Sequence, residues 1–450
     1  MKENIAAIST TLGVGAISII RVSGPSSIKE VNKISKVDLL NKESHTITYS
    51  YIESKNEIID EVLITIMKTP KTFTKEDVVE INCHGGIATT KKVLELLLEQ
   101  NIRLAEPGEF TKRAFLNGRI DLTQAEAVMD LINVKSDKAR KIAINNLKGA
   151  TTNKIKKLRQ TLVDIISNIE VNIDYPEYLD IEEMTINKIK KELKTIEEEL
   201  NKIIENSKNS KIIKDGINVA IIGRPNVGKS SILNTLTGYE KAIVTDIAGT
   251  TRDIVEESII LDGIQLNLID TAGIRKTDNL VEQIGVERSK KELEKADLIL
   301  LVLNNNEKLT EEDKKLIDMS SDKKRIIIIN KNDLETKIEI KELPEQEIIT
   351  TNTISDDGII DLKNKIKELF NLEELETTDY NYVSNINQLN MIEEAKKSLN
   401  SLKENIENNF PIDIIEIDIK NIWELLGKVI GETYTEELLD NLFSKFCVGK

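Results

Sequence analysis

The stretch GRPNVGKS, residues 223–230, decides the fold of the middle of this 450-residue chain. It matches the pattern G-x-x-x-x-G-K-[S/T], directly follows the apolar run 217–222 and precedes a helical pattern. Strand, glycine-rich loop and helix in this order predict a loop whose backbone N–H groups surround phosphate, assisted by the positive end of the helix. We expect Lys229 to contact the β- and γ-phosphates of a nucleotide and the Ser230 hydroxyl to bind Mg²⁺.

Two further motifs follow predicted strands. DTAG at 270–273 comes after the strand 265–269, so its carboxylate can reach Mg²⁺ through water and its glycine N–H can reach the γ-phosphate. NKND at 330–333 also comes after a strand. The Asp333 carboxylate can accept hydrogen bonds from N1–H and the 2-amino group of guanine, whereas adenine would leave it facing another acceptor. These motifs, in this order, predict binding and hydrolysis of GTP.

Two polar loops complete the predicted nucleotide site. TDIAGTTRD at 245–253 is a plausible switch segment, ordered when a threonine reaches Mg²⁺ and the γ-phosphate. SDDG at 355–358 follows the last predicted strand and would close over the base. The residues that we expect around GTP are Asn226, Val227, Gly228, Lys229, Ser230, Ser231, Thr245, Asp246, Ile247, Ala248, Gly249, Thr250, Thr251, Asp270, Thr271, Ala272, Gly273, Asn330, Lys331, Asn332, Asp333, Ser355, Asp356 and Asp357.

The hydrolytic step needs a group other than the residue that follows DTAG. That residue is Ile274, at the place where Ras-like proteins have a glutamine that orients the attacking water. An aliphatic side chain cannot position water. Glu282 is the nearest carboxylate downstream of the polar loop 275–279.

The spacing of apolar residues divides the chain into domains. Residues 1–118 predict a mixed α/β domain, because runs such as 60–66 alternate like half-buried strands. Residues 119–212 and 374–450 repeat apolar positions every three or four residues, which is typical of bundle helices. Between them, 213–373 alternate short strands with helices and predict a parallel sheet covered on both faces. We therefore expect a multidomain α/β plus all-α protein with an α/β domain inserted into a helical domain.

Composition limits the function classes. The net charge of −15 argues against a protein that grips nucleic acid through its whole surface, although a local basic patch is possible. Two cysteines far apart exclude a disulfide framework, and two histidines without suitable spacing make a zinc site improbable. Because the chain also shows no apolar run of membrane-spanning length, we expect a cytoplasmic protein.

Several stretches outside the nucleotide motifs carry distinctive sequences. They are IIRVSGP (19–25), EDVVEINCHGG (76–86), PGEFTKRAFLNG (107–118), DLTQAEA (121–127) and CVGK (447–450). In these stretches the chain resembles the bacterial tRNA modification GTPases of the MnmE (TrmE) family over nearly its full length. The resemblance implies an N-terminal domain that binds folate and dimerises, and a Ras-like P-loop GTPase domain inserted into a helical-bundle domain.

The resemblance also implies a reaction. Family members modify the wobble uridine, position 34, of certain tRNAs at carbon 5, as homodimers that work with the FAD-binding partner MnmG in a heterotetramer. A tetrahydrofolate such as 5-formyltetrahydrofolate supplies the one-carbon unit. By resemblance, the folate-contacting positions are Arg21, Glu80, Arg119 and Lys450, and Cys447 matches a cysteine considered important for the tRNA chemistry. An exposed thiol on a tail is the alternative interpretation of Cys447.

For the GTPase step, the resemblance implies stimulation by K⁺. The positions that match the K⁺ ligands are Asn226, Thr245, Ile247 and Thr250, and Ser230 and Thr251 match the Mg²⁺ ligands. Glu282 matches the carboxylate that orients the attacking water. Asp356 departs from the alanine that is frequent at this place in the family.

Two other functions are compatible with parts of the sequence. A ribosome-assembly GTPase would need a basic RNA-binding domain, which the sequence does not show beside its negative charge. A folate-dependent methyltransferase or carrier with a vestigial GTPase domain conflicts with the intact phosphate and base motifs.

Overall fold

The chain folds into two compact units in a computed structural model. The first unit comprises Met1–Met129, Asn146–Asn201 and Asn385–Lys450, and the second comprises Asp130–Asn145 and Lys202–Ser384. The second unit is therefore inserted in the first, in agreement with the predicted insertion of an α/β domain into a helical one. The structure describes residues 3–55, 57–174, 179–238, 258–261, 263–269, 295–344, 347–355, 357–370, 372 and 382–449. None of the helices within these ranges is long and apolar enough to cross a membrane.

The N-terminal part of the first unit is a six-stranded sheet with the order β3-β4-β5-β2-β1-β6. All its neighbouring strands are antiparallel except β1 and β6, which are parallel. The elements are β1 (Asn4–Ile8), β2 (Ile17–Ser23), α1 (Ser27–Asn32), β3 (Thr46–Ser54), β4 (Glu57–Met67), β5 (Val78–His84), α2 (Ile87–Leu98) and β6 (Ile102–Leu104).

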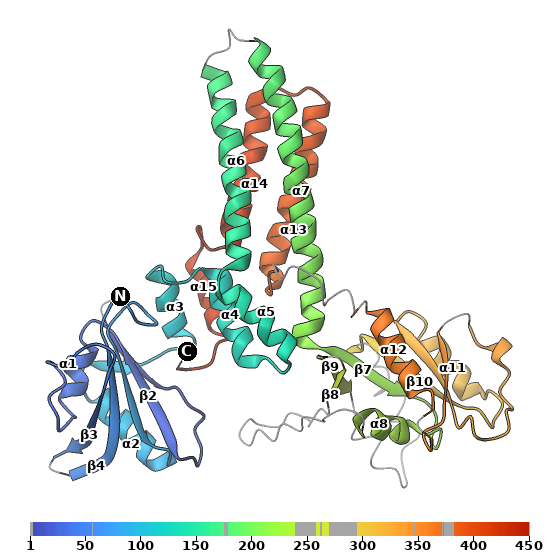
Figure 1. The fold of residues 1–450 in the computed structure, drawn as a ribbon, viewed down its shortest axis with the longest axis horizontal. Helices are drawn as coiled ribbons and strands as arrows, with labels where there is room; N and C mark the ends of the chain where they lie inside the picture. The colour runs from blue at the N-terminus through green and yellow to red at the C-terminus, as the bar shows by residue number, and fades with distance from the viewer. Residues whose placement is uncertain are drawn as a thin grey trace. The chain divides into compact units, whose positions relative to one another are not determined.

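One face of this sheet is covered and the other is largely open (Figure 1). The covered face carries side chains such as Ile64 and Ile81, which pack with apolar residues of α1 and α2. The alternate residues point to the opposite face, as the period of a strand requires. There Ile47, Tyr49 and Leu63 are exposed. At the β1 end the same face is covered by an aromatic cluster described below.

Short helices connect the sheet with the helical part of the first unit. They are α3 (Glu109–Leu116), α4 (Leu122–Asn133) and α15 (Glu436–Phe443), whereas α5 (Asp137–Leu147) lies mostly in the second unit. Phe115 of α3 packs with Leu439 and Phe443 of α15, so the C-terminal segment docks beside the sheet. Phe446 lies beyond the end of α15 but is still buried.

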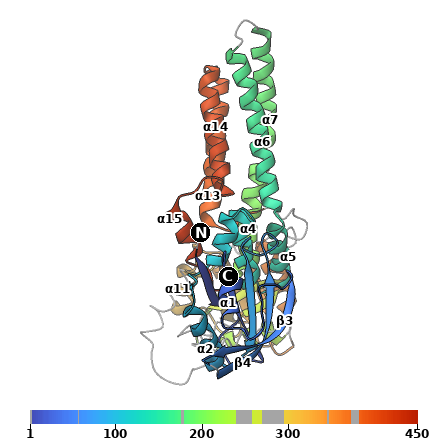
Figure 2. The same ribbon diagram turned by 90° about the vertical axis from the view of Figure 1, so that its left-hand side faces the viewer.

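Long helices form the rest of the first unit (Figure 2). They are α6 (Ala150–Asp174), α7 (Leu179–Asp215), of which residues 179–201 belong to this unit, α13 (Ile386–Glu407) and α14 (Ile412–Val429). The helix α14 packs against both α6 and α13, and ion pairs from Glu197 to Lys403 and from Glu199 to Lys154 attach α7 to α13 and α6. The predicted apolar stripes are confirmed by burial of Ile155, Leu158, Leu162, Ile165, Ile169, Ile189, Leu193, Ile196, Leu200 and Ile203.

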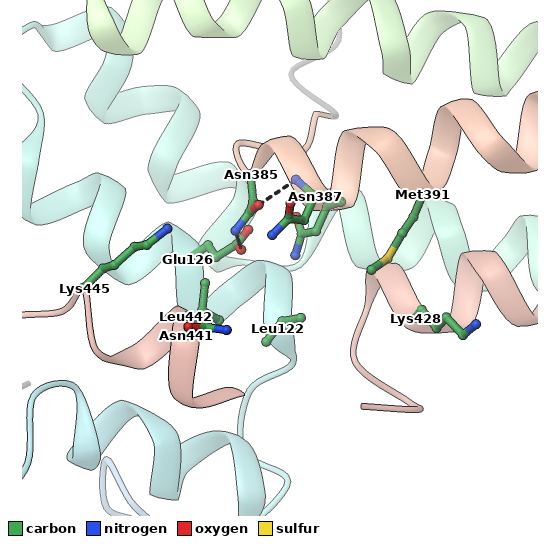
Figure 3. Close-up of a pocket in the computed structure, with 10 residues that line it drawn as sticks. Leu122, Glu126, Asn385, Asn387, Met391, Lys428, Asn441, Leu442 and Lys445 are labelled. Atoms are coloured by element: carbon green, nitrogen blue, oxygen red, sulfur yellow. Dashed lines mark hydrogen bonds between the residues drawn. The ribbon is translucent and has the colours of Figure 1, made fainter. Parts of the chain in front are cut away.

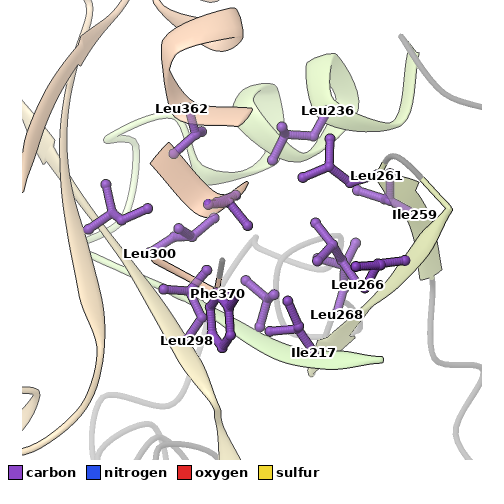
Figure 4. Close-up of a cluster of buried hydrophobic side chains, with 14 of the residues drawn as sticks. Ile217, Leu236, Ile259, Leu261, Leu266, Leu268, Leu298, Leu300, Leu362 and Phe370 are labelled. Atoms are coloured by element: carbon purple, nitrogen blue, oxygen red, sulfur yellow. The ribbon is translucent and has the colours of Figure 1, made fainter. Parts of the chain in front are cut away.

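The second unit contains a six-stranded sheet with the order β12-β11-β10-β7-β9-β8. Its elements are β7 (Ile217–Ile222), α8 (Lys229–Gly238), β8 (Ser258–Leu261), β9 (Ile264–Ile269), β10 (Leu298–Asn304), α11 (Glu311–Met319), β11 (Arg325–Asn330), the 3₁₀ turn Ile340–Glu342, β12 (Ile348–Thr351) and α12 (Ile359–Leu369). Apolar clusters cover both faces, and Figure 4 shows the one under α8 and α12. The predicted parallel order holds for β7 and β9–β12, whereas β8 is antiparallel to β9.

Candidate active site

The loop 223–230 joins the end of β7 to the start of α8, as the sequence predicts. Two of its glycines are required by close approaches. A Cβ on Gly223, at φ +152°, would lie 2.4 Å from the carbonyl oxygen of Val302, and a Cβ on Gly228, at φ +102°, would lie 2.1 Å from Nδ2 of Asn330. Only glycine fits such contacts in this backbone conformation. The loop is therefore pressed against β10 on one side and the end of β11 on the other.

Lys229 points back along the loop. Its Nζ donates to the carbonyl oxygens of Gly223, at 2.6 Å, and Arg224, at 2.7 Å. Burial lowers the pKa of this lysine. A bound phosphate would favour the charged ammonium and oppose that effect, so the position suits an anionic ligand.

The NKND motif lies at the end of β11 and braces the loop 223–230, the phosphate loop. In the sheet, β10 lies between β11 and the strand β7 that leads into this loop. Asn330, 1% exposed, donates from Nδ2 to the carbonyl oxygen of Val227 at 3.0 Å, and its Oδ1 accepts from the Thr351 hydroxyl at 3.1 Å. Lys331 donates from Nζ to the carbonyl oxygen of Asn226 at 2.8 Å. The phosphate loop and the motif predicted to recognise the base are thus joined directly. The first two residues of that motif, Asn330 and Lys331, position the loop.

The predicted base-contacting residues lie at the same edge of the sheet. Asp333 follows β11 and is exposed, as are Ser355 and Asp357 after β12. Asn352 and Asp357 exchange backbone hydrogen bonds of 3.0 and 3.1 Å, which closes the turn that carries the SDDG stretch. Because parallel strands present their carboxyl ends at one edge, this edge is where ligands of open α/β sheets bind.

An anchor of the phosphate loop was not predicted from the sequence. Arg224 donates from Nε to both carboxylate oxygens of the buried Asp313, at 2.9 Å, and from Nη2 to Glu307 at 2.6 Å. Asp313 also caps α11 together with Thr310. The capping pattern T-x-x-D at 310–313 is visible in the sequence, but it gives no sign of the arginine partner.

Several predicted residues lie outside the residues that the structure describes. From the predicted switch and DTAG segments these are Thr245, Asp246, Ile247, Ala248, Gly249, Thr250, Thr251, Asp270, Thr271, Ala272 and Gly273. Glu282, Asp356 and Lys450 also lie outside the described ranges.

A second group of predicted residues comes together on the sheet of the first unit. Arg21 on β2 and Glu80 on β5 face each other across the ladder, with Nε of Arg21 2.8 Å from Oε1 of Glu80. The carbonyl oxygen of Gly449 accepts from Nη1 of Arg21 and from the Ser9 hydroxyl, each at 3.2 Å. The C-terminal stretch therefore lies directly on this pair. Ser9 and Gly449 were not among the predicted site residues.

Aromatic rings border this group. Arg21 lies over the ring of Phe110 at 5.8 Å, and Arg119 lies over the ring of Phe73 at 4.8 Å. Both rings belong to one cluster that packs on β1. The thiol of Cys447 is exposed, while its carbonyl oxygen accepts from the backbone N–H of Gly108 at 3.3 Å. The structure thus brings Arg21 and Glu80 into contact, and Arg119 stands over the neighbouring ring.

Comparisons with known proteins identify the family. The model of the MnmE helical domain matches residues 122–447, and that of the GTP-binding protein TrmE N-terminus matches residues 4–119. A curated tRNA modification GTPase MnmE from Bacillus cytotoxicus is 51% identical over 100% of this chain and 99% of its own length. One from Streptococcus thermophilus is 50% identical over 100% and 98%.

Among solved structures, the G domain of the T. maritima FeoB iron transporter is 29% identical over 34% of this chain and 97% of that chain, with a TM-score of 0.26. A TM-score this low carries no argument, so the assignment rests on the family models and the full-length relatives. On that evidence, this chain belongs to the MnmE (TrmE) family of tRNA modification GTPases.

Proposed function

We propose that this chain is a K⁺-stimulated GTPase that, with an FAD-containing MnmG partner, adds a carboxymethylaminomethyl or aminomethyl group to C5 of the wobble uridine of certain tRNAs. A tetrahydrofolate such as 5-formyltetrahydrofolate would supply the one-carbon unit. The contact between the Gly449 carbonyl and Arg21 carries the proposal, because it brings the stretch with Cys447 against the pair assigned to folate.

The chemistry of this group suits a folate. Arg21 and Arg119 offer guanidinium groups to the carboxylates of the glutamate tail, and Glu80 offers a carboxylate to the N–H groups of the pterin. The rings of Phe73 and Phe110 provide apolar surface beside these charges. Lys450 would add a cation next to Gly449.

A homodimer is supported by the open face of the same sheet. The exposed side chains Ile47, Tyr49 and Leu63 share that face with Arg21 and Glu80. Contiguous exposed apolar side chains are typical of protein interfaces. A second copy that covered them would lie beside the proposed folate site.

The proposed GTP site would hold two cations. We assign Mg²⁺ to Ser230 and Thr251, and K⁺ to Asn226, Thr245, Ile247 and Thr250. Of these, Ser230 and Asn226 are described, and both are exposed at the mouth of the loop. K⁺ would supply positive charge near the phosphates. Glu282 would orient the attacking water through a second water, since Ile274 cannot.

The same proposal specifies the assembly and its compartment. The homodimer would combine with MnmG into a heterotetramer that receives tRNA. A tRNA substrate implies work in the cytoplasm, and the two free thiols, Cys83 and Cys447, suit its reducing conditions.

The ion assignment is tested by GTP hydrolysis in K⁺ and in Na⁺ at equal ionic strength and at several protein concentrations. We expect faster hydrolysis in K⁺ and a rate per molecule that rises with concentration, because the GTPase domains would dimerise. Equal rates in the two salts would refute the K⁺ assignment.

The tRNA chemistry is tested by mass analysis of wobble nucleosides. Cys447→Ser should depress modification and leave GTP hydrolysis unchanged, because the thiol lies in the C-terminal stretch of the first unit. Cys83→Ala, which removes the buried thiol, is the control and should retain both activities. Glu282→Ala should lose both. Full modification by Cys447→Ser would remove the role of that thiol.

A further inference from the structure

The first unit contains a cavity of about 90 Å³ that the functions above do not use (Figure 3). It lies among α4, α13, α14, α15 and the segment that follows α15. That volume is several times the space that one water needs, so a planar ring can enter. The residues around it that matter below are Glu126, Asn385, Gln388, Met391, Lys428 and Lys445.

Gln388 is the unusual member of this lining. It is 2% exposed, and neither Oε1 nor Nε2 has a hydrogen-bond partner among the described residues. Buried amides in proteins nearly always have partners, because an unpaired buried donor or acceptor loses its bonds to water without replacement. The neighbouring amide is already engaged: Asn385 donates from Nδ2 to Glu126 Oε1 at 2.7 Å and accepts from the Asn387 backbone at 2.8 Å.

The rest of the lining supplies an apolar and a cationic part. Met391 and Leu442 are half-buried at the cavity, and a methionine thioether packs well against flat rings. Lys428 and Lys445 are exposed, and within the described ranges neither ammonium has a carboxylate partner. A ligand that fits must therefore present a donor beside an acceptor, a flat apolar surface and a negative charge.

We propose that this cavity binds a single nucleotide, with the base edge paired to Gln388 and the phosphate near one of the two lysines, Lys428 and Lys445, which lie at opposite ends of the cavity (Figure 3). Every nucleobase carries an adjacent donor and acceptor on one edge, so one glutamine amide can pair with it twice. The nucleotide belongs either to an RNA strand or to a free nucleoside monophosphate, which share this chemistry. The site is separate from the GTP site in the second unit and does not depend on the function proposed above.

The test is equilibrium dialysis of the full-length chain against labelled UMP, uridine and a single-stranded uridine pentanucleotide. UMP avoids the GTP site, where Asp333 favours guanine. Gln388→Met keeps the side-chain length and removes both hydrogen-bonding groups. We expect it to weaken binding about tenfold or more. Gln160→Met, the same change at an exposed position of α6, should leave binding unchanged.

Two further measurements separate binding from folding. Gln388→Met should unfold at the same temperature as the parent protein or higher, and its GTP hydrolysis should be normal, since it removes an unpaired buried amide. Lys428→Gln combined with Lys445→Gln should weaken UMP and leave uridine unaffected. Because uridine lacks the phosphate, this pair of ligands isolates the cationic part of the site.

The outcomes decide the proposal and the source of the nucleotide. Binding of UMP that Gln388→Met abolishes supports a free mononucleotide, and binding of the pentanucleotide alone supports a strand of RNA. Absence of binding by both ligands, or binding that Gln388→Met leaves intact, overturns the proposal and assigns the space to water. Wobble modification is measured separately, so failure here and failure of the proposed function are distinguishable.

Discussion

The phosphate loop takes its shape from consecutive residues, whereas the site around Arg21 joins segments up to 440 positions apart. In the loop, Lys229 reaches back only to Gly223 and Arg224. Asn330 and Asp313, which form hydrogen bonds across 103 and 89 positions, then brace the loop from outside. Around Arg21, the pair with Glu80 spans 59 positions and the contact with Gly449 spans 428. A site of the first kind depends on backbone geometry, and one of the second kind depends on the packing of whole elements.

The largest expected effect concerns the choice of base at the locally built site. Asp333→Asn should shift preference from GTP to xanthosine triphosphate by roughly a hundredfold or more, because xanthine has a carbonyl where guanine has the amino group. Competition binding with both nucleotides measures the shift. Asp322→Asn, in the exposed turn before β11, is the control and should keep the preference for GTP. An unchanged preference in Asp333→Asn would end the role of this carboxylate.

A smaller effect tests whether backbone geometry controls the loop. Gly228→Ala should lower GTP affinity by about ten- to a hundredfold, since a Cβ would meet Nδ2 of Asn330 at 2.1 Å in a left-handed backbone. Gly263→Ala is the matched control: φ is +79°, but the nearest atom to its Cβ is 3.5 Å away. It carries the conformational strain without the collision. Equal losses in both variants would mean that strain, not the contact with Asn330, matters.

A substitution in the site around Arg21, which joins distant segments, should change the affinity for folate and not the hydrolysis of GTP. Arg21→Met should lower the affinity for 5-formyltetrahydrofolate about tenfold, because it removes the bonds to Glu80 and Gly449. GTP hydrolysis should be unchanged. Lys36→Met removes another cation that pairs with a glutamate and lies over a ring on the same sheet, and should bind folate normally. Folate affinity that is unaltered in Arg21→Met would contradict the assignment.

The smallest expected effect concerns another pair on this sheet. His84 Nδ1 lies 2.7 Å from Asp60 Oδ1, and the hydrogen bond with this carboxylate, followed by its charge, raises the pKa of His84 above 6.5. Its contribution to stability is complete below the unfolded pKa and is lost as the pH rises through the folded one. Asp60→Asn should lower the pKa of His84, measured by NMR in a His45→Gln background that leaves a single imidazole. An unaltered titration would exclude the pair.

Periodicity and motifs predict much of this fold, because they depend on neighbours in sequence. The run 217–222 is β7, and the buried stripes of α6 and α7 have the predicted spacing of three or four residues. The antiparallel strand β8 was not predicted, since its four residues leave too short a pattern to specify direction. Each of these features depends on residues that lie within a few helical turns or within one strand.

In the candidate sites too, the sequence predicts features that depend on neighbouring residues and misses contacts between distant segments. The positions of the phosphate loop and of the NKND motif follow from residue order. The hydrogen bond from Asn330 to the loop and the ion pair between Asp313 and Arg224, which span 103 and 89 positions, were not predicted. The contact of Ser9 with Gly449 leaves no periodic trace in the sequence. Only resemblance to a family connected Arg21 with the C-terminal stretch, because a hydrogen bond between distant segments depends on how several elements pack.

The contact between Ser9 and Gly449 has a consequence for the order of folding. It closes a chain loop of 440 residues that encloses the whole GTP-binding unit. The entropy of loop closure grows only with the logarithm of length, so the inserted unit adds little thermodynamic cost. The kinetic cost is different, since pairings of high sequence separation form late. During refolding, competence to bind GTP should therefore return before the C-terminal stretch settles on β1 and β2.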